Sequence, residues 1–327
     1  MIFIEKVKCF LENNNLDRID TEKKKIIVIY GPTASGKTSL SIEMAKYINS
    51  EIISTDSRQI FKGLDIGTGK VTNREMEGII HHMIDIITPD KQYSVGEFKK
   101  SAEKIIEDIH TKGRIPILCG GTGLYIDSLI YDFKIPEIPA DEQLRTKLEQ
   151  EALKNGNEYV YNKLVELDSE YAKELHPNNT RYVIRALEVK MLTGKSKSEF
   201  REEKILKYDT LFLTPYNGNR EELYKNIDKR VKYMFDNGLL EEVKELLKTY
   251  ERDSFGLKTI GYKEVVNYLL DLGIENTNLK KLNLGEKEKH GIKLNLSETI
   301  DLVQKNNRNY AKKQLTWFRK YEPEKNI

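Results

Sequence analysis

Short apolar segments alternate with helical patterns along the N-terminal part of the chain. Ile26–Tyr30, Glu51–Ser54 and Ile115–Cys119 are isoleucine-containing runs, each followed by glycine or polar residues. Such runs are typical of the buried strands of a parallel sheet. Between the second and third runs, Ser94 opens a capping box and apolar residues recur at helical spacing as far as Ile109. This alternation predicts an α/β fold in which helices connect parallel strands.

The pattern changes after the third strand. Pro136 and Pro139 interrupt the chain, and the segments that follow, up to about Lys204, have helical periodicity. Thr210–Thr214 then has the pattern of another strand. We therefore predict a helical N-terminal extension at residues 1–24, a core domain formed by residues 25–135 and 205–327, and an inserted all-helical domain at residues 136–204.

The C-terminal part is predicted to be helical. Helices are expected over Arg220–Asn237, Leu239–Tyr250, Lys258–Leu272 and Glu298–Tyr321, and the polar segment Glu275–Ser297 is expected to be a surface loop. The net charge of +2 does not by itself indicate a nucleic-acid partner. The last helix, however, concentrates positive charge, because no acid occurs between its first and last basic residues, which are Lys305, Arg308, Lys312, Lys313, Arg319 and Lys320.

Composition narrows the class of protein. Hydrophobic residues make up 39% and charged residues 32% of the 327 positions, which is typical of a globular protein large enough for two domains. No apolar run reaches the roughly 20 residues of a membrane-spanning helix, and charges interrupt the N-terminal segment where a signal peptide is continuous. Only Cys9 and Cys119 are present, so neither a disulfide framework nor a zinc site is expected. We expect a cytoplasmic protein with no membrane partner.

One segment carries a strong chemical signal. Residues 31–38 match the motif G-x-x-x-x-G-K-[ST], and they stand between an apolar strand and a helix as the motif requires. Backbone N–H groups of such a P-loop converge on phosphate oxygens, Lys37 adds a positive charge, and the Thr38 hydroxyl can coordinate Mg²⁺. The expected ligand is a diphosphate or triphosphate with Mg²⁺. The residues predicted to bind it are Gly31, Pro32, Thr33, Ala34, Ser35, Gly36, Lys37 and Thr38.

Two other segments follow strands at the same predicted edge of the sheet. Asp56 comes after Glu51–Ser54, and the string Gly120-Gly121-Thr122 comes after Ile115–Cys119. Ligands of open α/β folds bind at this edge. Asp56 is a candidate general base for a nucleophile bound opposite the phosphates, although an aspartate after a strand equally fits the cap of a turn. The glycine string offers backbone donors and one hydroxyl, but alone it is a common turn.

Other conspicuous residues favour structural roles. His81 and His82 are neighbours, so in a strand they point to opposite faces, and no cysteine or acid cluster accompanies them; a metal site is not expected there. Trp317, Tyr321 and Tyr310 are expected to pack on the inner face of the last helix in preference to stacking on bases.

Several strings taken together resemble the tRNA dimethylallyltransferase family. They are GPTASGKT, DSRQIFKGLDIGTGK at Asp56–Lys70, HHMIDI at His81–Ile86, GGTGLY at Gly120–Tyr125, IGYKE at Ile260–Glu264 and YAKKQLTWFR at Tyr310–Arg319. The resemblance covers nearly the whole chain and, without a C-terminal zinc-finger motif, fits the bacterial type. It implies a P-loop NTPase-like parallel sheet flanked by helices, with an inserted all-helical domain. It also implies Mg²⁺-dependent transfer of a dimethylallyl group from dimethylallyl diphosphate to the N6 amine of the adenosine 3′ of the anticodon.

The resemblance further implies roles for individual residues. Asp56 matches the family's general base, Thr122 matches a hydroxyl near the bridging oxygen, and Lys37 and Arg230 match cations that bind the diphosphate. The tRNA anticodon stem-loop is implied to meet Asp56, Ser57, Arg58, Gln59, Arg145, Arg181, Arg185, Lys258, Gly261, Tyr262, Lys263, Arg308, Lys312 and Lys313. A monomer is expected, because nothing in the sequence requires an oligomer.

Two other classes of protein share some of these features. A small-molecule or nucleotide kinase would use the same P-loop and Mg²⁺ but would transfer a phosphoryl group to a hydroxyl. A nucleotide-gated RNA-binding module would bind tRNA without transfer chemistry and would tolerate the loss of Asp56. The reaction product distinguishes the first alternative, and substitution of Asp56 distinguishes the second.

Overall fold

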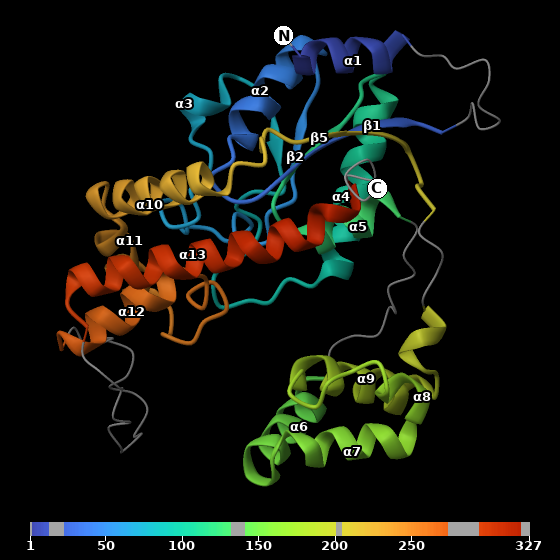
Figure 1. Ribbon diagram of the computed structural model, residues 1–327, viewed down its shortest axis with the longest axis vertical. Helices are drawn as coiled ribbons and strands as arrows, with labels where there is room; N and C mark the ends of the chain where they lie inside the picture. The colour runs from blue at the N-terminus through green and yellow to red at the C-terminus, as the bar shows by residue number, and fades with distance from the viewer. Residues whose placement is uncertain (1, 13–22, 132–140, 201–204, 274–293, 322–327) are drawn as a thin grey trace. The chain divides into compact units, whose positions relative to one another are not determined.

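The computed structural model describes residues 2–12, 23–131, 141–200, 205–273 and 294–321 (Figure 1). The chain divides into two compact units, one formed by Met1–Ile130 and Leu206–Ile327 and the other by Tyr131–Ile205. Within the described part of the chain, no helix is both long and apolar enough to cross a membrane.

The larger unit is built on a five-stranded sheet in the order β3-β2-β4-β1-β5, and its neighbouring strands all run parallel. The predicted parallel sheet is thus confirmed. Its strands are β1 (Lys25–Tyr30), β2 (Ile52–Ser54), β3 (His81–His82), β4 (Ile117–Gly120) and β5 (Asp209–Leu213). β3 was not predicted as a strand, because it consists of two histidines and has no apolar run.

Helices cover both faces of the sheet (Figure 1). On one face, Val7 packs with Ile27, Ile29 and Met44, which brings α1 (Ile2–Glu12) and α2 (Lys37–Tyr47) against β1. On the other face, the Tyr30 ring contacts the rings of Phe318 and Tyr321, with centroids 5.2 and 5.1 Å apart. The remaining helices of this half are α3 (Asn73–Met76), α4 (Val95–Thr111) and α5 (Gly123–Ile130). The capping box predicted at Ser94 does begin α4.

The C-terminal helices are α10 (Arg220–Asp236), α11 (Leu239–Thr249), α12 (Tyr262–Asp271) and α13 (Leu296–Phe318), followed by a 3-10 turn over Arg319–Tyr321. α13 packs against α10 and α12 (Figure 1). The predicted start of α12 at Lys258 is wrong, because Gly261 has a φ of 95° and begins the helix after a turn. The surface loop predicted to end at Ser297 ends earlier, because Asn295 caps α13; residues 274–293 lie outside the described residues.

The smaller unit, as far as it is described, contains only helices. These are α6 (Glu142–Asn155), α7 (Asn157–Leu167), α8 (Ser169–Ala172), α9 (Thr180–Thr193) and a 3-10 turn over Lys197–Phe200. Leu148, Val160, Leu164, Val183 and Leu187 form its apolar core. This unit therefore has its own hydrophobic core, as an inserted helical domain requires.

Candidate active site

The glycine loops predicted to share one edge of the sheet lie on neighbouring strands. Tyr30 of β1, which leads into the P-loop, pairs with Gly120 of β4, which leads into the second glycine loop. The backbone of Thr55 fastens the segment after β2 to the same place: its N–H donates to the Cys119 carbonyl (2.8 Å), and its carbonyl accepts from the Thr122 N–H (3.1 Å). Asp56 and Thr122 are therefore brought to the P-loop by backbone hydrogen bonds.

The P-loop has the backbone that its motif predicts. Gly36 has a φ of 90° and is followed immediately by α2, so the helix N-terminus faces the loop. The Lys37 ammonium donates to the carbonyl of Pro32 (2.6 Å). Burial lowers the pKa of Lys37 to about 8, with Arg230 adding to the decrease and Cys119 and Asp56 opposing it. The ammonium is therefore poorly solvated, and a bound anion would compensate for the lost hydration.

Asp56 caps a turn and also faces the site. Its Oδ1 accepts the backbone N–H of Arg58 at 2.9 Å, which is the turn cap considered above. Its charge is also felt across the site, since it raises the pKa of Tyr310 and opposes the lowering of the pKa of Arg230. The two interpretations of Asp56 are thus compatible, because one carboxylate oxygen is sufficient for the cap.

Thr122 is held beside Asp56 by Ser57. Its hydroxyl oxygen accepts the Ser57 N–H at 3.0 Å and donates to the Ser57 hydroxyl at 3.2 Å. Tyr310, expected only to pack, lies at this point as well. Burial, followed by the charge of Asp56, raises the pKa of Tyr310 to about 12, while hydrogen bonds with Thr122 and Gln314 oppose the increase.

Arg230 reaches the same site from α10. Its guanidinium donates to the carbonyls of Thr68 (3.2 Å) and Gly69 (3.3 Å), and burial lowers its pKa while Asp56 opposes that change. Lys37, Asp56 and Arg230 influence one another electrostatically, and Thr122 is hydrogen-bonded to Thr55 and Ser57 on either side of Asp56. The four predicted catalytic residues, Lys37, Asp56, Thr122 and Arg230, therefore lie at one site.

Gln314 was not predicted as a site residue. It is buried in α13, and its side chain joins the two glycine loops: Oε1 accepts the Thr33 N–H (2.9 Å) and Nε2 donates to the Gly121 carbonyl (2.9 Å). A Cβ at Gly121 would lie 2.3 Å from Gln314 Nε2, so a larger residue at position 121 would displace the Gln314 amide from this contact. The only sequence signal was its place in the string YAKKQLTWFR, which gives no direction for the side chain.

The predicted tRNA-binding residues of the larger unit differ in exposure. Arg58, Lys258, Lys263, Lys312 and Lys313 are exposed, whereas Gly261 and Tyr262 are buried. Gln59 donates to the Gly69 carbonyl (3.3 Å), and Arg308 is paired with Asp228 of α10. Trp317 is 40% exposed, and the Lys320 ammonium lies 4.3 Å from its ring centre, so Trp317 is less buried than expected.

In the smaller unit, Arg181 is exposed on α9. Arg145 and Arg185 instead pair with Glu188, whose side chain is fully buried. The Arg145 Nε lies 2.9 Å from one carboxylate oxygen of Glu188, and the Arg145 Nη2 lies 3.0 Å from the other. Burial alone would raise the pKa of Glu188, but these hydrogen bonds hold it below its usual value. These two arginines therefore have a structural partner within their own unit.

The histidine pair makes contacts typical of a structural role. His82 Nε2 lies 2.7 Å from a carboxylate oxygen of Glu51, which also pairs with Lys112 and Arg114. Among the residues that the structure describes, no group of three or more His, Cys, Asp or Glu side chains could hold a metal ion.

Comparison with known proteins adds family information. The chain matches the family model described as IPP transferase over residues 59–321. A tRNA dimethylallyltransferase of Acetivibrio thermocellus is 45% identical over 300 residues, which cover 91% of this chain and 89% of the relative. One from Halothermothrix orenii is 45% identical over 314 residues, covering 95% and 89%.

Solved structures agree with these matches. The tRNA isopentenylpyrophosphate transferase from Bacillus halodurans has a TM-score of 0.61 at 41% identity, with 91% of this chain and 87% of that chain covered. A eukaryotic dimethylallyltransferase acting on tRNA has a TM-score of 0.73 at 32% identity, covering 90% and 70%.

Proposed function

Because the chain belongs to the IPP transferase family, as its motifs predicted, we propose that it prenylates tRNA. The reaction moves the dimethylallyl group of dimethylallyl diphosphate to the N6 amine of the adenosine 3′ of the anticodon and releases diphosphate. The observation that carries the proposal is the convergence of Lys37, Asp56, Thr122 and Arg230 beside a P-loop. The comparisons give no support to the kinase alternative.

The positive charges of the site explain how the diphosphate leaving group is stabilised. When the allylic C–O bond breaks, its electron pair passes to the diphosphate, where Lys37, Arg230 and the loop N–H groups stabilise the charge. Thr38, at the start of α2, would supply a protein ligand to Mg²⁺. Mg²⁺ is commonly held by few protein groups together with substrate phosphates and water, which fits a site without a carboxylate cluster among the described residues.

Asp56 accounts for activation of the acceptor. The exocyclic amine of adenine is conjugated with the ring and is a weak nucleophile, so it gains from a base that accepts its proton as the N–C bond forms. One Asp56 oxygen is occupied by the Arg58 N–H, which orients the carboxylate, and the other can accept that proton.

The acceptor side also needs to bind an RNA stem-loop. Arg58, Lys258, Lys263, Lys312, Lys313 and Arg181 are exposed cations that can pair with phosphates. The target base must leave its stack, at a cost of a few kcal/mol, before its amine can meet Asp56. A tRNA substrate supports a cytoplasmic site of action.

A direct assay tests this function. Purified protein is incubated with unmodified tRNA, Mg²⁺ and dimethylallyl diphosphate, and the digested nucleosides are weighed by mass spectrometry. We expect an adenosine heavier by one C₅H₈ unit. Phosphorylation of a small acceptor by ATP, without this product, would instead establish a kinase.

Donor binding is expected to depend on the charge of Lys37. Its pKa is about 8 without a ligand, and a diphosphate binds best to the protonated ammonium. The KM for dimethylallyl diphosphate should therefore be lowest below pH 8 and rise by up to about tenfold per pH unit above it. Lys37→Arg is the matched control, because a guanidinium stays charged in this range. Equal pH profiles for both proteins would contradict the assignment.

A further inference from the structure

We propose that Glu242 and Tyr262 are a positioning pair, which sets the place of Arg230 by holding the loop Asp65–Gly69. This inference rests on the proposed function, because its measured consequence is the binding of the diphosphate donor. The hydrogen bonds of both side chains go to the loop and to each other, so their effect on the donor is expected to pass through the loop.

The Glu242 carboxylate accepts hydrogen bonds from the backbone N–H groups of this loop. Its Oε2 accepts from Asp65 (3.1 Å) and Ile66 (2.8 Å), and its Oε1 accepts from Gly67 (3.3 Å). Three successive N–H groups directed at one carboxylate fix the path of the backbone, since a charged acceptor makes stronger hydrogen bonds than a neutral one. Glu242 comes from α11, so the loop is tied to a helix.

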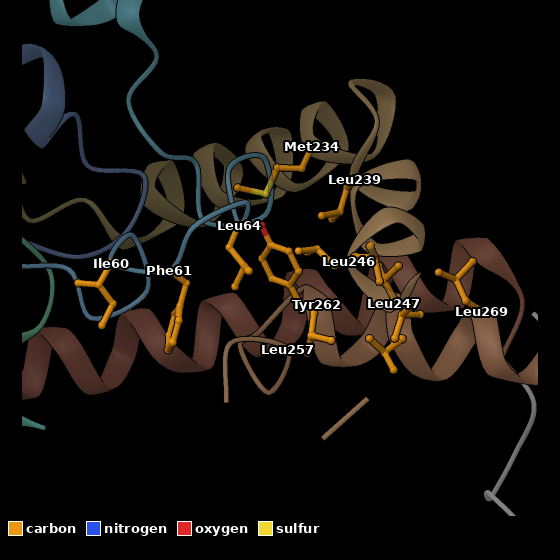
Figure 2. Close-up of a cluster of buried hydrophobic side chains, with 13 residues drawn as sticks. Ile60, Phe61, Leu64, Met234, Leu239, Leu246, Leu247, Leu257, Tyr262 and Leu269 are labelled. Carbon is orange, nitrogen blue, oxygen red and sulfur yellow. The ribbon is translucent and has the colours of Figure 1, made fainter. Parts of the chain in front are cut away.

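Tyr262 completes the arrangement from α12. It is fully buried, with its ring in the centre of an apolar cluster that includes Leu64 and Leu246 (Figure 2). Its hydroxyl accepts the Gly67 N–H at 3.0 Å and donates to Glu242 Oε1. Burial and the adjacent Glu242 raise the pKa of Tyr262, so its hydroxyl keeps the proton that it donates. A Cβ at Gly67 would lie 2.4 Å from the Tyr262 ring, so the two are in close contact.

The far end of the loop holds Arg230. The Arg230 Nη2 donates the two hydrogen bonds described above to the carbonyls of Thr68 and Gly69. Gly69 has a φ of 57°, and a Cβ there would lie 1.8 Å from that nitrogen, so the backbone lies directly against the guanidinium. A shift of the loop must therefore shift the cation that influences Lys37. Tyr262 is thus assigned to positioning the loop, and not to direct contact with RNA.

A double-mutant cycle tests the proposal. We expect Tyr262→Phe and Glu242→Gln each to raise the KM for dimethylallyl diphosphate by about tenfold, with a smaller change in the KM for tRNA, because a misplaced binding group costs affinity at a distance. In an Arg230→Ala background the same substitutions should change the donor KM by less than about twofold, because residues that act through one another are not additive.

Two control variants match the chemistry of the substitutions. Tyr321→Phe removes a buried tyrosine hydroxyl that donates to Asp127, and Glu51→Gln neutralises a buried glutamate paired with His82. Both should lower the thermal midpoint but leave the donor KM unchanged. Should Glu242→Gln fail to fold, Tyr262→Phe alone decides the question.

Two results would overturn the inference: an unchanged donor KM in folded Tyr262→Phe, or an equal increase with and without Arg230. Absence of prenyl transfer by the unmodified protein would instead refute the proposed function, so the two failures are distinguishable.

Discussion

Asp56→Asn is expected to lower the rate constant of prenyl transfer by about 10²-fold or more, because a general base contributes that much when it accepts a proton in the transition state. The amide has nearly the same shape and retains an oxygen that can accept the Arg58 N–H, so the turn after β2 should persist. Single-turnover transfer to tRNA under saturating donor gives the rate constant directly.

Binding measurements on the same variant separate catalysis from assembly of the site. The affinity for tRNA and the KM for dimethylallyl diphosphate should each stay within a few-fold of their original values, since the carboxylate is hydrogen-bonded to Arg58 of its own turn and an asparagine can keep that bond. Asp108→Asn controls for the chemistry of the substitution, because Asp108 is a surface aspartate of α4 that pairs with Lys112. A variant that retains the full rate of prenyl transfer would rule out Asp56 as the general base, whereas an RNA-binding module would show no transfer with either residue.

Features encoded over short distances in the chain were predictable. The P-loop, the capping box at Ser94 and the apolar strands each occupy a few consecutive residues, and the local backbone follows from their chemistry. Parallel pairing then places the ends of β1, β2 and β4 at one edge, so the amino-acid sequence is sufficient to predict that Asp56 and Thr122 meet the P-loop.

Features that depend on distant partners were not predictable from the sequence. Gly67 and Glu242 are 175 positions apart, and Thr33 and Gln314 are 281 positions apart. No periodicity or spacing records which backbone group a buried side chain will meet. Tyr262 illustrates the difficulty: the resemblance implied that it binds RNA, whereas in the structure its hydroxyl donates a hydrogen bond to Glu242. Similarly, the resemblance implied that Arg145 and Arg185 bind RNA, whereas the structure pairs both side chains with Glu188.

Glu188→Gln should destabilise the smaller unit by about 3 kcal/mol, because it leaves two guanidinium groups without their buried counter-charge. The carboxylate also accepts the N–H of Asp141, which begins α6, so the loss reaches the packing of α6 on α9. Hydrogen exchange measured by mass spectrometry should therefore accelerate over residues 141–200, while the core around β1 keeps its protection.

The matched variant on the same helix is Arg181→Ala. Arg181 is exposed on α9, so its removal should leave hydrogen exchange unchanged and weaken tRNA binding with a shallower salt dependence. Arg145→Ala should accelerate hydrogen exchange with little change in the salt dependence of tRNA binding, because it leaves part of a buried carboxylate unpaired.

The stability of the smaller unit should also depend on pH through Glu188. The pKa of Glu188 is lowered in the folded state, so its contribution to stability is present at neutral pH. This contribution is lost as the pH falls below the unfolded value of about 4.3 and through the folded one. Equal stability of all three variants would mean that the Glu188 pairs contribute nothing, and that Arg145 is free to serve the RNA as the resemblance implied.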